Sequence, residues 1–237
     1  MLYTIIFAAI LPAFLLVFYI YLRDRYQREP LSQVLKAVLF GVFSAGIALV
    51  LEESLQILGI VGAASTWLGA VWNAFVGAAM PEEAAKLLML WLLLRRNPYF
   101  DERFDGIVYA CCIGMGFAGT ENIVYLLNNI DGWQSVAVQR AIFAVPGHFF
   151  FAVAMGFFYS QIAFRDLPAY RKSLIFFAPV VPHGIYDGLL FMANVTPAIA
   201  GLLVMAFYVF CFWSFRLGRN RIRKMSEESD PDNIKFF

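Results

Sequence analysis

The chain has 237 residues, of which 61% are hydrophobic, 17% aromatic and only 15% charged, with a net charge of +1. An ordinary globular domain is about half apolar and about one quarter charged, so the composition argues against a soluble domain and predicts a polytopic membrane protein. The three cysteines, Cys111, Cys112 and Cys211, lie in apolar runs without metal-binding spacing. We therefore expect neither a disulfide framework nor a cysteine zinc site.

Seven apolar runs, separated by short polar segments, are candidates for transmembrane helices. They cover residues 2–22, 34–51, 67–94, 107–127, 135–164, 174–195 and 197–215. The first run has no basic segment before it and a charged segment after it, so we interpret it as a retained helix rather than a signal peptide. The sequence thus predicts one all-α transmembrane bundle over residues 1–215 and a disordered tail over residues 216–237.

The basic residues predict how this bundle lies in the membrane. Three Lys or Arg residues follow each of the first, third and fifth runs, six lie in the tail, and the alternate loops contain none. Cytosolic loops carry the excess of Lys and Arg. We therefore expect an outside N-terminus, a cytosolic C-terminus and an odd number of spans.

The third run contains Glu82, Glu83 and Lys86 within about 28 otherwise apolar residues, which as a helix would be about 42 Å long. A carboxylate deep in a membrane is costly unless it is paired, protonated or facing a wet cavity. Pro81 suits the first turn of a new helix, whose positive end would lie near the two acids. Lys86 is spaced to pair with either acid. These residues indicate a functional site rather than a surface salt bridge.

Three later runs also carry deep polar residues, namely Glu121 and Asn122 in the fourth, His148 in the fifth, and His183 and Asp187 in the sixth. Counted from the cytosolic ends of their helices, the polar groups of the four runs lie about 15–26 Å deep. The hydrocarbon core is about 30 Å thick. We therefore expect these groups to form one site within the membrane.

Each group also has a purely structural alternative. His183 and Asp187 could be a buried pair that stabilises their helix, and Glu121 with Asn122 could hold two helices together by hydrogen bonds. His148 follows a Pro-Gly pair and could satisfy backbone groups that the proline leaves free.

Three charged residues nearer the outer ends of their helices are expected to have no chemical role. We expect Arg140 to extend toward the membrane surface or to balance an acid. Glu52 and Glu53 are expected to be a solvated helix end. Small residues at Gly114, Gly116 and Gly119 favour close helix approach around Glu121.

Carboxylates and imidazoles in a sheltered pocket suit the activation of water. A glutamate could act as general base on a water molecule while a histidine donates a hydrogen bond to the developing oxyanion. Alternatively, His148, His183 and Glu83 could hold a zinc ion, although the sequence His-Glu-x-x-His is absent. A third possibility is a proton-coupled transporter, but no inverted repeat is visible. We expect the lipid bilayer and no nucleic acid as a partner.

The order of these motifs resembles one known family. Glu82-Glu83-Ala-Ala-Lys86 resembles EExxK, and the segment from Phe117 to Glu121-Asn122 resembles FxxxEN. With His148 and His183-Gly-Ile-Tyr-Asp187 following in order, the chain resembles the PrsW-type intramembrane proteases, distant relatives of the CAAX prenyl endopeptidases and Abi membrane proteins.

This resemblance implies an endopeptidase of the bacterial inner membrane, with a catalytic core over about residues 67–195. The implied function is site-1 cleavage of a single-pass membrane protein, an anti-sigma factor, in envelope stress signalling. Related enzymes are described both as glutamate-dependent and as metalloproteases, so zinc remains an alternative here. The resemblance implies catalytic roles for Glu82, Glu83, Glu121, His148, His183 and Asp187, with supporting roles for Lys86 and Asn122.

Overall fold

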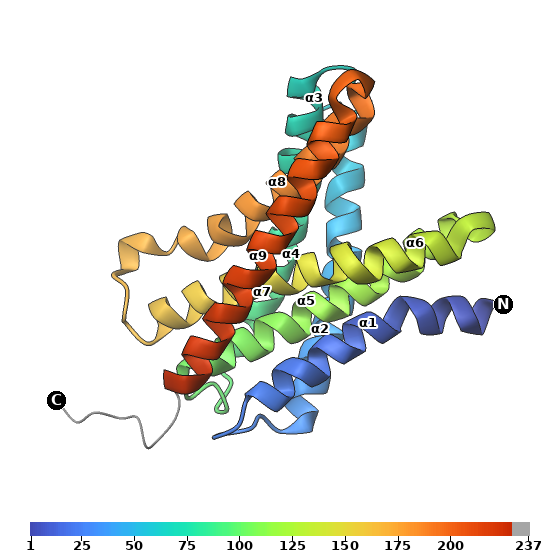
Figure 1. The fold of residues 1–237 in the computed structure, drawn as a ribbon. Helices are drawn as coiled ribbons and strands as arrows, with labels where there is room; N and C mark the ends of the chain where they lie inside the picture. The colour runs from blue at the N-terminus through green and yellow to red at the C-terminus, as the bar shows by residue number, and fades with distance from the viewer. Residues whose placement is uncertain (229–237) are drawn as a thin grey trace.

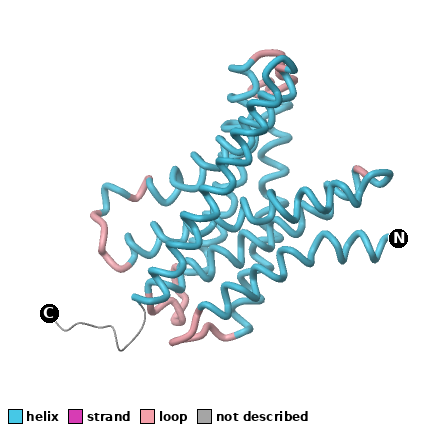
Figure 2. The backbone as a smooth tube through the Cα atoms, viewed as in Figure 1, coloured by secondary structure: helices cyan, strands magenta, loops and turns pink. Residues whose placement is uncertain are grey.

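The computed structural model describes residues 1–228, and this part of the chain contains helices and no strands (Figures 1 and 2). Six helical segments have the length and apolar character needed to cross a membrane. The α-helices are α1 (Leu2–Arg23), α2 (Leu31–Ile57), α3 (Trp67–Trp72), α4 (Met80–Leu94), α5 (Arg103–Asn128), α6 (Trp133–Gln139), α7 (Val145–Ala163), α8 (Leu174–Val195) and α9 (Ala200–Glu228).

The third predicted span is formed by α3, a π-helical turn (Asn73–Ala79) and α4, which follow one another without a break. It is a seventh helical segment, but it is not among the six apolar ones. Glu82, Glu83 and Lys86 lower its hydropathy. The predicted all-α transmembrane bundle is therefore confirmed.

Helix α5 lies at the centre of the bundle and packs against α1, α2 and α7. Of its most apolar stretch, 78% is buried, against 22% for α1. Glycines allow this close packing: a Cβ atom on Gly41 of α2 would lie 2.1 Å from the carbonyl oxygen of Ile113 in α5. A Cβ on Gly114 would lie 2.9 Å from Ala152 of α7. The predicted close helix approach is confirmed at Gly114 and at Gly116, where a Cβ would lie 2.1 Å from the carbonyl oxygen of Val38. At Gly119 a Cβ would make only an ordinary contact, 3.7 Å from Ala13.

Helix α8 organises the second half of the bundle, since it packs against α3, α7, α9 and the π-helical turn before α4. In Figure 1, α3 and the ends of α8 and α9 that are joined to each other lie at the top, whereas α6 lies at the right. Gly184 of α8 allows the ring of Phe75 to approach; a Cβ there would be 2.5 Å from that ring. This contact sets the spacing between α8 and the start of α4.

Helix α9 continues to Glu228, beyond the expected end of the last span at residue 215. Ile222 and Met225 are buried in the main hydrophobic core, and the hydroxyl of Ser226 donates a hydrogen bond to the carbonyl oxygen of Arg23 at 2.8 Å. Packing on α1 and α5 thus gives residues 216–228 a fixed helical place. The rest of the predicted tail lies outside the described residues.

Candidate active site

Two prolines change the helix geometry just before the polar residues of α4 and α7. Pro81 and Pro146 each lie in the first turn of a helix that follows directly on a π-helical turn, which before α7 covers Arg140–Ala144. A proline cannot donate the helical hydrogen bond, so the preceding turn adopts a wider pattern. Glu82, Glu83 and His148 come one or two residues after these prolines. The altered turns therefore set the direction in which these side chains point.

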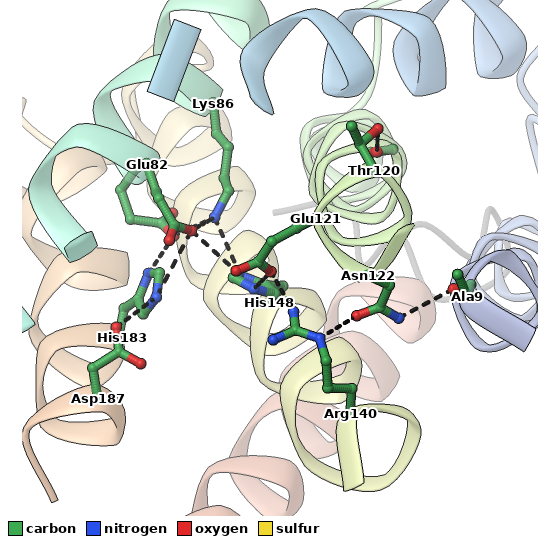
Figure 3. Close-up of polar contacts among 12 residues, drawn as sticks. Ala9, Glu82, Lys86, Thr120, Glu121, Asn122, Arg140, His148, His183 and Asp187 are labelled. Carbon is green, nitrogen blue, oxygen red and sulfur yellow. Dashed lines mark hydrogen bonds and ion pairs between the residues drawn. The ribbon is translucent and has the colours of Figure 1, made fainter. Parts of the chain in front are cut away.

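All six predicted catalytic residues come together in one cluster, as Figure 3 shows for the labelled ones. They come from four helices: α4 contributes two glutamates, α5 and α7 contribute Glu121 and His148, and α8 contributes His183 and Asp187. Glu82, Glu83, His148 and His183 are all at most 6% exposed. The structure therefore brings together the residues that were predicted to share one site.

Lys86 occupies the middle of the cluster. Its ammonium donates hydrogen bonds to Glu83 Oε1 at 2.8 Å, Glu82 Oε2 at 3.1 Å and His148 Nδ1 at 3.2 Å. It also lies 3.9 Å from the centre of the Phe117 ring. Because an ammonium group has only donors, Nδ1 of His148 accepts, and the proton of a neutral His148 is on Nε2. Lys86 thereby neutralises buried acid and selects one histidine tautomer.

The second histidine lies between carboxylates. Nδ1 of His183 is 2.9 Å from Glu83 Oε1, and its Nε2 is 3.3 Å from Asp187 Oδ2. The ring stacks on Phe151 with centroids 4.8 Å apart. These contacts hold the imidazole in one orientation, with Asp187 in the orienting position that carboxylates often take beside catalytic or metal-binding histidines.

Arg140 joins Glu121 to this network. Its guanidinium donates to Glu121 Oε2 and to Asn122 Oδ1, both at 2.5 Å, and the amide of Asn122 donates to the carbonyl oxygen of Ala9 at 3.1 Å. Glu121 Oε2 is in turn 2.9 Å from His148 Nε2. Of the two expectations for Arg140, the balancing of an acid is confirmed. In the sequence, Arg140 stood out as a charged residue within an apolar run, and such a residue is by itself an indication of a functional site.

A cavity of about 950 Å³ opens beside the cluster and is lined by residues from α2, α4, α5, α7, α8 and α9, among others. Glu82, Glu121, both histidines and Asp187 lie on its wall, whereas Glu83 lies behind them and is fully buried. Glu82 Oε2 is 3.9 Å from His148 Nδ1 and 3.8 Å from His183 Nε2. Both separations are too long for a direct hydrogen bond, and a water molecule can link polar groups at such distances.

One expectation from the sequence is wrong. Glu52 is not a solvated helix end, because it is half-buried and lines the same cavity as Glu82. Its neighbour Glu53 is exposed, as expected. The register of α2 explains the difference: the face that packs on α5 through Gly41 and Ala48 also turns Glu52 inward.

The same cluster fits a metal ion. One ligand atom from each of Glu82, Glu83, His148 and His183 lies within 4.8 Å of the others. Two carboxylates and two imidazoles form a donor set typical of zinc. Glu83 Oε2 is also buried without a hydrogen-bond partner among the described residues. A metal would take up carboxylate and imidazole atoms that now accept hydrogen bonds from Lys86.

Comparison with known proteins places this geometry in a family. The chain is 33% identical over 215 residues to "Protease PrsW" of Clostridioides difficile, an alignment that covers 89% of this chain and 87% of the relative. It is 34% identical over 207 residues to that of Geobacillus kaustophilus, covering 87% and 88%. The Bacillus subtilis protein is 31% identical over 215 residues, covering 89% and 92%. No solved structure gives a significant match.

The family comparison also decides between the classes of function that the residues left open. Residues 29–214 match the model of the PrsW family, described as intramembrane metalloproteases. The protein is therefore a peptidase and a multi-pass bacterial membrane protein, rather than a transporter. The chain belongs to the PrsW family of intramembrane proteases.

Proposed function

We propose that the cavity hydrolyses a peptide bond in a single-pass membrane protein, with Glu82 as the general base. The single observation that carries this proposal is the position of the Glu82 carboxylate, on the cavity wall and 3.8–3.9 Å from nitrogens of both histidines. A water molecule beside Glu82 Oε2 would be within reach of this carboxylate as a base and of His183 Nε2 as a hydrogen-bond donor.

In the proposed reaction, the water oxygen attacks the carbonyl carbon while Glu82 takes the proton. His183 donates a hydrogen bond from Nε2 to the developing oxyanion. The C–N bond then breaks as the proton passes from Glu82 to the leaving nitrogen, and a carboxylic acid and an amine are released. Lys86 and Asp187 position the reacting groups, because both hold their partners through direct contacts.

Glu83, His148 and His183 would hold a zinc ion if the enzyme uses one, with Glu82 remaining free to act as the base. Such an ion would polarise the carbonyl group and make its water more acidic. With or without the ion, Glu82 moves the proton, and Glu121 keeps the proton of His148 on Nε2.

The family resemblance supports a membrane-anchored anti-sigma factor as the natural substrate. The test is cleavage of a candidate anti-sigma factor by purified protein in liposomes. We expect Glu82→Gln and Glu83→Gln to abolish cleavage and Glu53→Gln, on the exposed side of α2, to leave it intact. Metal analysis of each variant, with a chelator titration, distinguishes the two mechanisms. Full activity in both glutamine variants of the site would refute the proposal.

A further inference from the structure

Helix α2 contributes a polar face to the cavity that the proposed mechanism does not use. Glu52 and, one turn later, Gln56 both line the cavity, close to the end of α2 at Ile57. Glu53, the next residue, is exposed and is not part of the cavity wall. Of the two adjacent glutamates, Glu52 therefore faces the cavity and Glu53 does not.

The charges on the cavity wall are paired with one exception. Three of its acids have an ion-pair partner: Glu82 with Lys86, Glu121 with Arg140, and Asp187 with His183. Across residues 1–228, the side chain of Glu52 makes no hydrogen bond or ion pair, although it lies within helix α2. The amine and the guanidinium in the site are already committed to other acids, so neither can neutralise Glu52.

The surroundings of Glu52 make this lack of a partner costly. Glu82 and Glu121 repel its carboxylate, while Lys86 and His183 attract it only from beyond ion-pair distance. A negative charge in a sheltered cavity is unfavourable unless an opposite charge approaches. A cationic side chain of the substrate would neutralise the unpaired charge of Glu52. The cation itself would gain an ion-pair partner within the membrane, where charged partners are rare.

We infer that Glu52 selects substrates that carry a lysine or arginine near the scissile bond, on the side that faces the end of α2. The inference rests on the proposed function, because the cavity must hold the substrate for Glu52 to contact it. Glu52 is thus a specificity residue that binds a substrate side chain and takes no part in the proton transfers at Glu82. Gln56 supplies an amide within one turn that can hydrogen-bond to the substrate backbone or to the same cation.

The experiment uses a set of synthetic transmembrane peptides with one apolar segment and a single variable position. Lysine, glutamine or glutamate is placed at successive positions on both sides of the segment centre, and cleavage in liposomes is followed by mass spectrometry. For the unmodified protein we expect one position at which lysine raises kcat/KM about tenfold over glutamine, with glutamate worst. Glu52→Gln should lose this ranking, Glu52→Lys should favour glutamate at that position, and Glu53→Gln should behave as the unmodified protein.

The outcomes separate this inference from the proposed function. Cleavage with no lysine preference, or a lysine preference that persists in Glu52→Gln, would overturn the role of Glu52 while peptide hydrolysis stands. Failure of the folded, unmodified protein to cleave any peptide would contradict the proposed function and the inference with it. Thermal unfolding in detergent checks that each variant is folded. Should Glu52→Gln not fold, Glu52→Asp serves instead, and a weakened but retained lysine preference would support the inference.

Discussion

Individual side chains in the site are held by contacts that extend well beyond the reacting groups. Arg140 binds Glu121 and Asn122, and its guanidinium also lies 3.9 Å from the centre of the Tyr125 ring. Its planar fork fits two acceptors at once, which a lysine ammonium cannot do in the same geometry. Arg140 is thus a positioning residue that acts on His148 through Glu121.

Replacing Arg140 tests this role. We expect Arg140→Gln to lower kcat about 10- to 100-fold with little change in KM, as for other residues that orient a catalytic histidine. Arg140→Lys should retain part of the activity, because it keeps the charge. The double variant with Glu121→Gln should be no slower than Glu121→Gln alone, since both changes break one interaction. Fully additive losses would show that Arg140 acts independently of Glu121.

Glu29 is a titrating residue outside the helices, in the loop between α1 and α2. Burial raises the pKa of Glu29 from its ordinary value of 4.5 to about 7, against the opposing effect of the hydrogen bond from the Tyr109 hydroxyl. The folded protein therefore binds more protons than the unfolded chain between these values. The contribution of neutral Glu29 to the free energy of unfolding is fully present below about pH 4.5 and is lost as the pH rises through about 7.

We therefore expect the protein in detergent to unfold at a higher temperature at about pH 5 than at about pH 8. Glu29→Gln should reduce this difference, because an amide stays neutral across the range. Glu53→Gln is the matched control, and it should keep the difference seen in the unmodified protein. Equal pH dependence in all three proteins would contradict the assignment to Glu29.

At the scale of the helices, the position of the site depends on how closely α5 can approach α2 and α7. Gly41 and Gly116 face each other across the first contact, and a Cβ on either would lie 2.1 Å from a backbone oxygen of the other helix. Without a hydrophobic driving force between helices in lipid, such close van der Waals packing is a main source of association.

Gly41→Val should therefore destabilise the bundle by at least about 1–3 kcal/mol, the usual cost of forcing extra atoms into a packed interior. Gly46→Val offers a matched control on the same helix, because a Cβ at Gly46 meets no atom within 4 Å. Thermal unfolding and cleavage activity would be compared for the two variants. Similar stability in both would mean that the α2–α5 contact is not needed.

The helices also explain what could be predicted from the sequence and what could not. Depth in the membrane follows from counting residues, so the convergence of Glu82, Glu121 and His183 on one level was predictable. Rotation about the helix axis depends on packing partners, so the sequence did not reveal that Glu52 faces inward and Glu53 outward. The π-helical turns before Pro81 and Pro146 were not predicted from the sequence either. Each of them changes the rotation of the helix that follows it.

Across the whole molecule, the outer helices expose apolar surface that suits contact with lipid. Only 11% of the most apolar stretch of the last helical segment is buried, and large side chains such as Phe212 and Trp213 are more than 60% exposed. The cluster of acids and histidines lies inside, beside the central helix α5. This arrangement fits a protein that exposes its apolar faces to the bilayer and keeps its polar residues around one cavity.

The distribution of basic residues predicts which ends of the bundle face the cytosol, and labelling can test it. Single cysteines at Asn129, before α6, and at Lys172, before α8, should react with a membrane-impermeant reagent from opposite sides. The native Cys111, Cys112 and Cys211 are buried and should stay unreacted. We expect the cysteine at residue 129 to be labelled from outside intact cells. Labelling of both from the same side would contradict the orientation.

We propose that these residues form one water-accessible site that hydrolyses a peptide bond within the membrane. Its most direct test is cleavage of a membrane-embedded peptide by the purified protein in water enriched in oxygen-18. We expect the new carboxyl terminus to contain oxygen-18 and folded Glu82→Gln to yield no product. An intact peptide after incubation with the folded, unmodified protein, or full cleavage by that variant, would contradict it.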